Sequence, residues 1–277
     1  MELVLIESGN FKDISHFFHF MEMLFVALVE LRERGTVPRD VTRLNIPHWN
    51  HPSWKGKGVN HNEWIVNRIF KNAMVVHDSV YTPNALVVDR ATQDKGTINK
   101  MWAKHIRRWD PREWSRFLDL PDTQEKLPVV TYINRQNTRR RLSDADHTSI
   151  IKSLNGVNGI VFRDIIMENY SFEQQVDFMN ETDLLLGVHG NGLTHAAFMK
   201  PHRAVCEIYP TGMTFQWDYY TLSKMMGHEY LCIFNGGTVP PSIFNSPGPR
   251  DHPSCGELSE MALVPLLGMI QQIKEEK

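Results

Sequence analysis

The sequence lacks an excess of either charge, because 30 Lys and Arg stand against 32 Asp and Glu in 277 residues. A chain without a basic excess attracts a polyanion weakly, so nucleic acid is not an expected partner. Long apolar runs are also absent. No stretch reaches the roughly 18 residues typical of a membrane-spanning helix, and the first ten residues lack the basic region and cleavage site of a signal peptide. The chain is therefore not expected to span a membrane or to direct its own secretion.

Cysteine is scarce and unevenly spaced. Cys206, Cys232 and Cys255 form no CxxC pair, which argues against a structural zinc site and against a disulfide framework. The redox compartment stays open at this point. Two Asn-X-Ser/Thr triplets, at 169–171 and 180–182, would fit a secretory lumen. Such triplets also arise by chance, so they carry little weight.

The apolar content of 42% is enough for a packed core, and its pattern after Pro128 indicates an α/β fold. Ser143 with Asp146, and Ser171 with Gln174, are helix-start signals. The expected strands are 128–133, 159–165, 182–188, 203–209 and 230–234, and the expected helices begin near 143, 171, 193 and 217. Strands and helices that alternate at this spacing predict βαβ units around a parallel sheet.

The first half is less regular and is interpreted as a second α/β lobe. Strands are expected at 3–7, 73–77 and 85–89, with a long apolar helix at 15–34 that Gly35 closes. The segment 38–62 is rich in Pro, Trp, His and Gly, and is expected to form a long surface loop, functional or mobile. The charged, proline-punctuated segment 110–126 separates the lobes, which gives domains at 1–125 and 126–277.

The stretch GVHGNGLTH, residues 187–195, follows an apolar strand and opens a helix. Ligands of open parallel sheets bind outside the carboxyl ends of the strands. Gly190 and Gly192 would let the backbone approach a ligand, Thr194 offers a hydroxyl, and helix N-termini attract phosphate. The alternative is a tight glycine turn with nothing bound. A GxGxxG fingerprint is absent from the chain, which makes a dehydrogenase less favoured.

Two further residues are expected at the same edge of this sheet. Arg135 follows the strand at 128–133, and a guanidinium there could hold a diphosphate together with the helix N-terminus. A solvated turn is the alternative, and it applies most to Arg139 and Arg141. Glu207 ends the strand at 203–209, where a carboxylate can accept two hydrogen bonds from a ribose. It could equally be an ordinary glutamate at the end of a strand.

The early helix carries His16, His19 and Glu22 at i, i+3 spacing, near one face. They could be metal ligands, although the signal is weak, or a general base with its orienting partner, or a mixed interface face. For His16 we favour the interface. Asp144 and Asp146 form a DxD pattern, but acidic residues at a helix N-terminus explain it without a metal.

Taken together and in this order, HFFHFMEM, INRQNTRRRL, SFEQQVDFMNETDLLL, GVHGNGLTH and CEIYP resemble glycosyltransferase family 61. This family includes plant xylosyl- and arabinosyltransferases of xylan and animal O-linked N-acetylglucosamine transferases of the secretory pathway. The resemblance covers nearly the whole chain, is strong at 127–234 and is thin at 32–110. Asn191 and His195 make the motif most similar to fungal members, since Ala and Asn are commoner at these positions.

The resemblance implies a GT-B architecture, in which two Rossmann-like lobes face a cleft and the C-terminal lobe holds a nucleotide sugar. It implies transfer with inversion from a UDP-sugar to a glycan or glycoprotein in the secretory pathway. Our own hypothesis is that this transfer requires no metal. Glu207 would contact the nucleoside, and His19 and Glu22 match the cleft-facing positions of the N-terminal lobe, where either is the expected base. The residues expected at the diphosphate are Arg135, Arg140, His189, Gly190, Asn191, Gly192, Leu193 and Thr194.

One departure leaves alternatives open. Family members usually have more sequence, commonly with a membrane anchor, before the histidine-containing helix, which predicts an N-terminal lobe that is either truncated or small. An incomplete lobe would favour a catalytically silent homologue that binds a nucleotide sugar or glycan without transfer. A third possibility is an α/β metal hydrolase that uses His16, His19 and Glu22.

Overall fold

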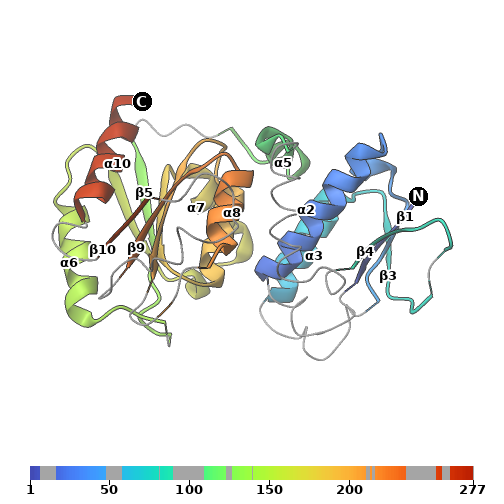
Figure 1. Ribbon diagram of the computed structural model, residues 1–277, viewed down its shortest axis with the longest axis horizontal. Coiled ribbons are helices and arrows are strands. Elements are labelled where there is room, and N and C mark those ends of the chain that lie inside the picture. The colour runs from blue at the N-terminus through green and yellow to red at the C-terminus, as the bar shows by residue number, and fades with distance from the viewer. Residues whose placement is uncertain are drawn as a thin grey trace. The chain divides into compact units, whose positions relative to one another are not determined.

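The computed structural model describes residues 1–6, 17–47, 58–80, 82–89, 109–122, 127–138, 140–209, 213, 216–234, 254–257 and 263–276. The chain forms two compact units, residues 1–109 with 116–119, and residues 110–115 with 120–277. Each unit has a parallel sheet with helices packed on it (Figure 1). Helix α5 (Pro111–Phe117) spans the change from one unit to the other, inside the charged segment at 110–126.

The first unit has a four-stranded parallel sheet in the order β3-β2-β1-β4. The strands are β1 (Glu2–Ile6), β2 (Arg43–Asn45), β3 (Met74–Val76) and β4 (Leu86–Asp89). Helix α2 (Phe17–Glu33) follows β1, and helix α3 (Gly58–Ile69) follows β2. The order 3-2-1-4 is that of the first strands of a dinucleotide-binding Rossmann sheet.

Helix α2 is apolar around most of its circumference, and the fold buries it accordingly. It ends at Gly35, whose φ of +68° is the left-handed conformation that glycine adopts at the C-terminus of a helix. The amide of Thr36 then donates to the carbonyl of Leu31 at 3.0 Å. The expected helix and its stop are confirmed, except for residues 15 and 16, which lie outside the described residues.

The expected surface loop at 38–62 is wrong in part. Pro38–Asp40 is a 3₁₀ turn (η1), β2 is an interior strand paired on both sides, and α3 begins at Gly58. A strand of three residues is too short to show an alternating pattern. Its polar residues Arg43 and Asn45 concealed it further. Residues 48–57 lie outside the described residues.

The second unit has a six-stranded parallel sheet in the order β10-β9-β8-β7-β5-β6. The strands are β5 (Val129–Ile133), β6 (Val161–Ile165), β7 (Leu184–Val188), β8 (Ala204–Tyr209), β9 (Glu229–Phe234) and β10 (Ser254–Glu257). The first five confirm the expected strands, whereas β10 and helix α10 (Leu263–Glu276) had not been expected. In chain order the sheet reads 2-1-3-4-5-6, which extends the flavodoxin-like order by one strand.

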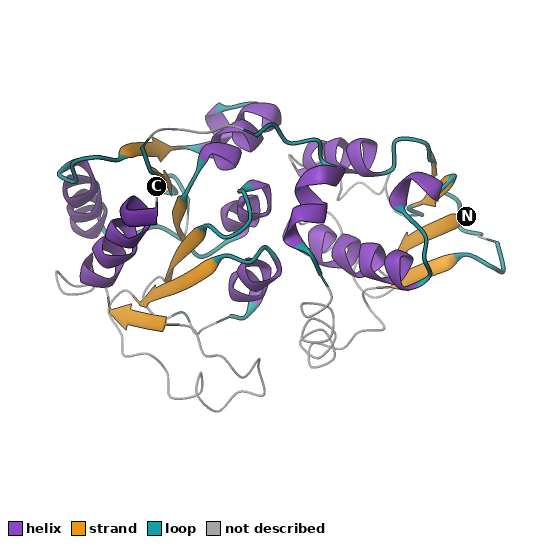
Figure 2. Ribbon diagram, turned by 90° about the horizontal axis from the view of Figure 1, so that it is seen from above, coloured by secondary structure: helices purple, strands orange, loops and turns teal. Residues whose placement is uncertain are grey.

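Helices cover both faces of this sheet. Helices α6 (Asp144–Asn155) and α10 lie on one face, and α7 (Phe172–Glu181) and α8 (Asp218–Met225) lie on the other (Figures 1 and 2). The expected start signals are confirmed, because Ser143 accepts a hydrogen bond from the amide of Asp146, and Ser171 and Gln174 form a capping box. Both caps satisfy amides that lack helical partners.

The α-helix expected from residue 193 is instead a 3₁₀ helix, η4 (Asn191–Phe198). Apolar spacing in so short a segment does not separate the two helix types. Two of its carbonyls also face histidine side chains, because His195 Nδ1 lies 2.9 Å from the Gly192 oxygen and His228 Nε2 lies 3.0 Å from the Ala196 oxygen. A second 3₁₀ helix, η3 (Met167–Asn169), follows β6.

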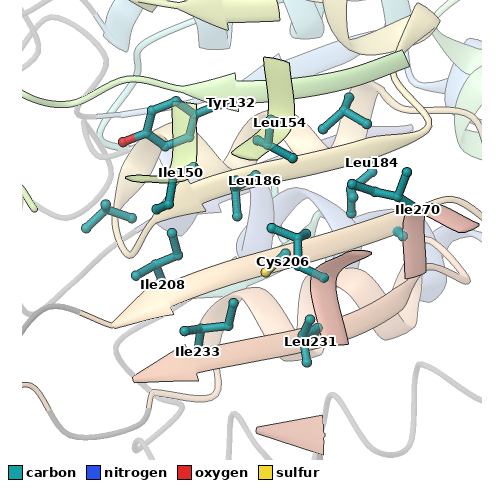
Figure 3. Packing of buried hydrophobic residues seen from close by; sticks show 14 of the residues in the cluster. Tyr132, Ile150, Leu154, Leu184, Leu186, Cys206, Ile208, Leu231, Ile233 and Ile270 are labelled. Carbon is teal, nitrogen blue, oxygen red and sulfur yellow. The ribbon is translucent and has the colours of Figure 1, made fainter. Parts of the chain in front are cut away.

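The core between the sheet and α6 with α10 is formed by alternate residues of neighbouring strands (Figure 3). Its members include Tyr132, Leu186, Cys206 and Ile208. The intervening residues of the central strands, Glu207 among them, face α7, α8 and η4. The central strands are therefore buried on both faces. Within the described ranges, none of the helices combines the length and apolar character that crossing a bilayer requires.

Candidate functional site

The sheet of the second unit has one topological switch point. Strand β5 pairs with β6 on one side and with β7 on the other, so the chain reverses its direction of winding at β5 and β7. Ligands of such sheets bind in the crevice outside the carboxyl ends at this point. Arg135 follows β5 by two residues, and His189 directly follows β7. The fold therefore brings two of the expected site residues to the same place.

Arg135 lies against the backbone of the turn that follows β7. Its Nη1 donates to the carbonyl oxygen of His189 at 2.9 Å. Gly190 has a φ of +144°, and a Cβ at that position would overlap the Arg135 Nη1 atom. The positive φ favours glycine, and any other residue would also require the end of the Arg135 side chain to move. Among the described residues, no other hydrogen bond to the guanidinium is present, so its remaining N–H groups are available to a ligand.

The other glycines of the turn allow close packing. A Cβ on Gly187 would lie 3.0 Å from Leu193, and a Cβ on Gly192 would lie 3.2 Å from Ile133. Leu193 is buried beneath the turn, so its side chain anchors η4 to the sheet. These glycines thus have a packing role, as the tight-turn alternative supposed. Contact of their amides with a diphosphate stays a prediction.

The polar side chains at the start of η4 contact one another. The Thr194 hydroxyl donates to Asn191 Oδ1 at 3.3 Å and also hydrogen-bonds to Tyr219 of α8. Burial raises the pKa of Tyr219 well above its usual range, so the phenol is neutral. Thr194 is fully buried, whereas Asn191 is half-buried. Arg140, in contrast, is exposed, and its charge helps to lower the pKa of Arg135, after the larger effect of burial.

Glu207 sits beneath the turn in a buried polar cluster. Its side chain is 0% exposed, and its two oxygens contact His189 Nδ1 and the hydroxyl of Tyr230. The His189 ring stacks on Tyr209 and meets Tyr219 edge-on, both at 5.3 Å between centroids. A buried carboxylate is tolerated when it is paired in this way. Contact with a ribose stays a prediction, and it would require this cluster to rearrange.

This cluster orients the imidazole of His189. A carboxylate only accepts hydrogen bonds, so Nδ1 carries the proton that faces Glu207. Burial and the nearby charge of Glu207 raise the pKa of Tyr230 well above its usual range, which keeps the phenol a donor to Glu207. No hydrogen bond to Nε2 is present among the described residues. Such carboxylate–histidine pairs fix which ring nitrogen is presented to a ligand.

Sequence reasoning missed the residues that support the turn from α7 and α8. Gln175 donates to the carbonyls of Met167 and Tyr170, so its Oε1 atom faces His195 Nε2 at 2.8 Å. The other ring nitrogen of His195 faces the carbonyl of Gly192. His195 therefore ties the glycine turn to α7.

The sequence did contain a signal for the buried pairing of Glu207, because a carboxylate inside the apolar run AVCEIY indicates a buried, paired group.

His19 and Glu22 belong to the first unit, in the first half of α2. His19 Nδ1 lies 2.9 Å from Glu22 Oε2, and their side chains are 25% and 11% exposed. This arrangement fits a base with an orienting partner. His16 lies outside the described residues. In the part of the chain that the structure describes, no group of three or more His, Cys, Asp and Glu side chains could hold a metal.

Asp144 and Asp146 lie in the first turn of α6. The Asp146 carboxylate accepts a hydrogen bond from the Ser143 hydroxyl at 2.6 Å. Acidic residues at this position stabilise the helix N-terminus. Asp146 therefore has a structural role in the cap, and Asp144 lies beside it in the same first turn.

Comparisons with known proteins cover the residues described above, from α2 to β8. The sequence pattern of the family Glycosyltransferase 61 matches residues 17–206, which is more than half of the chain. The "EGF domain-specific O-linked N-acetylglucosamine transferase" of Mus musculus is 28% identical over 133 residues, 46% of this chain and 23% of that protein. "Alpha-1,3-arabinosyltransferase XAT3" of Oryza sativa subsp. japonica is 28% identical over 129 residues, 45% of this chain and 21% of that protein. The matched segments thus span less than a quarter of these relatives. The chain belongs to glycosyltransferase family 61.

Proposed function

We propose that this chain is an inverting glycosyltransferase that moves a sugar from a UDP-sugar to a hydroxyl group of a glycan or glycoprotein. In this reaction the acceptor oxygen attacks the anomeric carbon, and the bond from that carbon to the diphosphate breaks. UDP leaves with the bonding electrons, and a base takes the acceptor proton. The reaction thus needs a stabilised leaving diphosphate and a base.

The observation that carries this proposal is the position of Arg135. Its guanidinium lies between the carboxyl ends of β5 and β7, against Gly190 and beside the start of η4. It is already held by the carbonyl of His189, so little rearrangement would be needed when a diphosphate binds. A preorganised donor aimed at developing charge typically contributes about 3 kcal/mol to catalysis.

His189 adds a second group on the donor side. Glu207 and Tyr230 hold its Nδ1 side, which leaves Nε2 as the nitrogen available to a ligand. As a donor, Nε2 would hydrogen-bond to a diphosphate oxygen and stabilise the leaving UDP. In this account Glu207 is a positioning residue. With the Arg135 guanidinium as the charged donor at the diphosphate, the proposed reaction is metal-independent.

The proposed base is Glu22 or His19 of the first unit. Their hydrogen bond couples the two groups, so either can take the acceptor proton while the other orients it. The proposed GT-B arrangement would place them across a cleft from the diphosphate. We propose that the protein is located in the secretory pathway, where glycans and glycoproteins are built.

The first experiment is a calorimetric titration of the purified chain with UDP, repeated with EDTA, with GDP as the control. Selective UDP binding that survives EDTA is the expected result. The Arg135→Ala variant should bind UDP more weakly by about 2–3 kcal/mol, because the guanidinium fork is lost. Arg116→Ala, which removes an exposed arginine of the first unit, is the matched control. A folded Arg135→Ala variant with unchanged affinity would remove Arg135 from the site.

Turnover is then measured with UDP-sugars and glycan acceptors. UDP release that depends on the acceptor supports transfer. UDP binding with no turnover, across a broad panel of donors and acceptors, would instead support the catalytically silent homologue. The names of the relatives do not favour that alternative, since both are transferases.

A further inference from the structure

The two Asn-X-Ser/Thr triplets of the sequence, at 169–171 and 180–182, have opposite environments in the fold. Such triplets are acceptors for N-linked oligosaccharides, but only an exposed asparagine can carry one in a folded protein. The first triplet joins η3 to α7, and the second joins α7 to β7. Their burial therefore decides which of them could be modified.

The second triplet is part of the interior. Asn180 is 2% exposed, and its amide donates to the carbonyl of Pro121 at 2.8 Å. Thr182 is fully buried, and its hydroxyl lies 2.7 Å from the Thr131 hydroxyl and 2.7 Å from the carbonyl of Phe178. An oligosaccharide on Asn180 would break the hydrogen bond to Pro121 and would have no path to solvent. The folded chain excludes a glycan at this position.

The first triplet is open to solvent. Asn169, Tyr170 and Ser171 are all exposed. The backbone amide of Asn169 donates to Ile166, while its side chain makes no hydrogen bond to any described residue. The Ser171 hydroxyl caps α7 by accepting from the amide of Gln174. A glycan on Asn169 would project into solvent and leave this cap and the core unchanged.

An independent observation concerns the compartment. Cys232 is disulfide-bonded, which the cysteine spacing did not lead us to expect. The register of β9 and β10 sets Cys232 opposite Cys255, and Cys206 is free and buried. Disulfides form and persist in oxidising compartments such as the lumen of the endoplasmic reticulum. N-linked oligosaccharides are attached in that same lumen.

We propose that the chain matures in an oxidising secretory lumen and carries an N-linked oligosaccharide on Asn169, with none on Asn180. The donor is a lipid-linked oligosaccharyl diphosphate. The Asn169 amide nitrogen bonds to the anomeric carbon of the oligosaccharide, the bond from that carbon to the lipid diphosphate breaks, and the amide loses one proton. The proposal does not depend on the transferase activity of the chain.

The test is to express the full chain behind a cleavable secretion signal in eukaryotic cells and to collect the soluble, folded fraction. Intact mass is measured before and after treatment with peptide N-glycosidase, which converts a glycosylated asparagine to aspartate. A mass decrease, with aspartate mapped to position 169 alone, is the expected result. An unchanged mass, or a glycan at position 180 in the folded fraction, would overturn the assignment.

Matched variants separate modification from folding. Asn169→Gln should lose the glycan and keep the melting temperature of the enzymatically deglycosylated chain. Ser171→Asp should also lose the glycan, because it removes the hydroxyl that the Asn-X-Ser/Thr triplet requires, while aspartate still caps α7. Asn180→Gln should keep the glycan and lower the melting temperature, since it disturbs the hydrogen bond to Pro121. A glycan that persists in Ser171→Asp would contradict the triplet as its cause.

Thiol labelling tests the disulfide of Cys232 separately. In denaturant without reductant, one cysteine of the secreted chain, Cys206, should react, and all three should react after reduction. Labelling of all three cysteines without reductant would overturn the disulfide, and with it the argument for an oxidising compartment. Neither measurement uses a nucleotide sugar, so failure here is distinct from failure of the proposed transferase.

Discussion

At the scale of single residues, the candidate site depends on the absence of a side chain at Gly190. Gly190 adopts a φ of +144° and leaves the space that the Arg135 guanidinium occupies. A glycine after β7 thus serves two purposes. It allows the observed packing of Arg135 on the turn, and it would allow a diphosphate to approach the backbone. Both give the same requirement, that no side chain stands between Arg135 and the backbone.

Gly190→Ala should displace Arg135 and weaken UDP binding by about 2–3 kcal/mol, as loss of the guanidinium would. Gly268→Ala, in α10, is the control, because a Cβ there has nothing within 4 Å. That change should leave UDP binding intact and raise stability by roughly 0.5–1 kcal/mol. Calorimetric affinities and melting temperatures of both variants check the prediction. Normal UDP affinity in a folded Gly190→Ala variant would show that the observed Arg135 position is not needed.

Substitutions of Glu207 and Tyr230 test whether the buried cluster around His189 acts as a unit. Glu207→Gln keeps the shape of the side chain but sets an amide donor against either His189 or Tyr230. Such a mismatch costs about 1–3 kcal/mol of the free energy of unfolding. Tyr230→Phe removes the other partner. In a double-mutant cycle by chemical denaturation, the two changes should couple by roughly 0.5–3 kcal/mol. Strictly additive effects would mean that the cluster does not act as a unit.

At the scale of elements, two histidines connect η4 to its neighbours, one to α7 and one to the start of β9. His195 ties its first turn to α7, and His228 ties Ala196 to the start of β9. His228 Nδ1 also accepts from the amide of Arg203. Since His228 accepts at one nitrogen and donates at the other, it must be neutral. Burial lowers its pKa to about 4, in agreement with these contacts.

Stability of the second unit should therefore fall as the pH falls. The unfolded chain takes up a proton on His228 near its ordinary pKa of 6.5, whereas the folded chain resists protonation down to about 4. The stabilisation is complete above pH 6.5 and is lost between pH 6.5 and about 4. The loss of unfolding free energy over this pH range, from the shift in the pKa of His228 alone, is about 3 kcal/mol. Chemical denaturation across this range should show a smaller pH slope for His228→Gln than for the wild type, and equal slopes would contradict the assignment.

At the scale of the whole molecule, the two units have separable roles in the proposed reaction. The second unit carries the proposed donor site, and the first carries His19 and Glu22. Binding of UDP should then be independent of the first unit's ionisable pair. Turnover should require both units, since the acceptor proton has no proposed base in the second.

Glu22→Gln should leave UDP affinity unchanged while lowering turnover by roughly 10²–10⁴-fold, the usual contribution of a general base. His19→Gln is compared with it. If Glu22 is the base, the His19 variant should lose less activity, and the reverse order would identify His19. Calorimetry and a UDP-release assay provide the two readouts. Full activity in both variants would move the base elsewhere.

The sequence by itself determined the first five strands of the second unit, the starts of α6 and α7, and the position of the glycine turn after β7. Local rules act over a few residues, so Ser143, Ser171 and Gly35 marked helix ends, and apolar runs marked the first five strands. The glycine motif, Arg135 and the early histidine helix were enough to indicate family 61. Short elements such as β2 escaped, because three residues cannot carry a periodic pattern.

Tertiary structure decided what no local pattern encodes, namely which side chains meet. The switch point depends on strand order, so only the fold could bring Arg135 against Gly190, 55 positions along the chain. It set Glu207 under His189 and Tyr230, where sequence reasoning had expected a ribose contact. It also buried one acceptor triplet and exposed the other. The physical reason is that burial and pairing belong to the packed sheet, and neither is fixed until strands distant in sequence lie side by side.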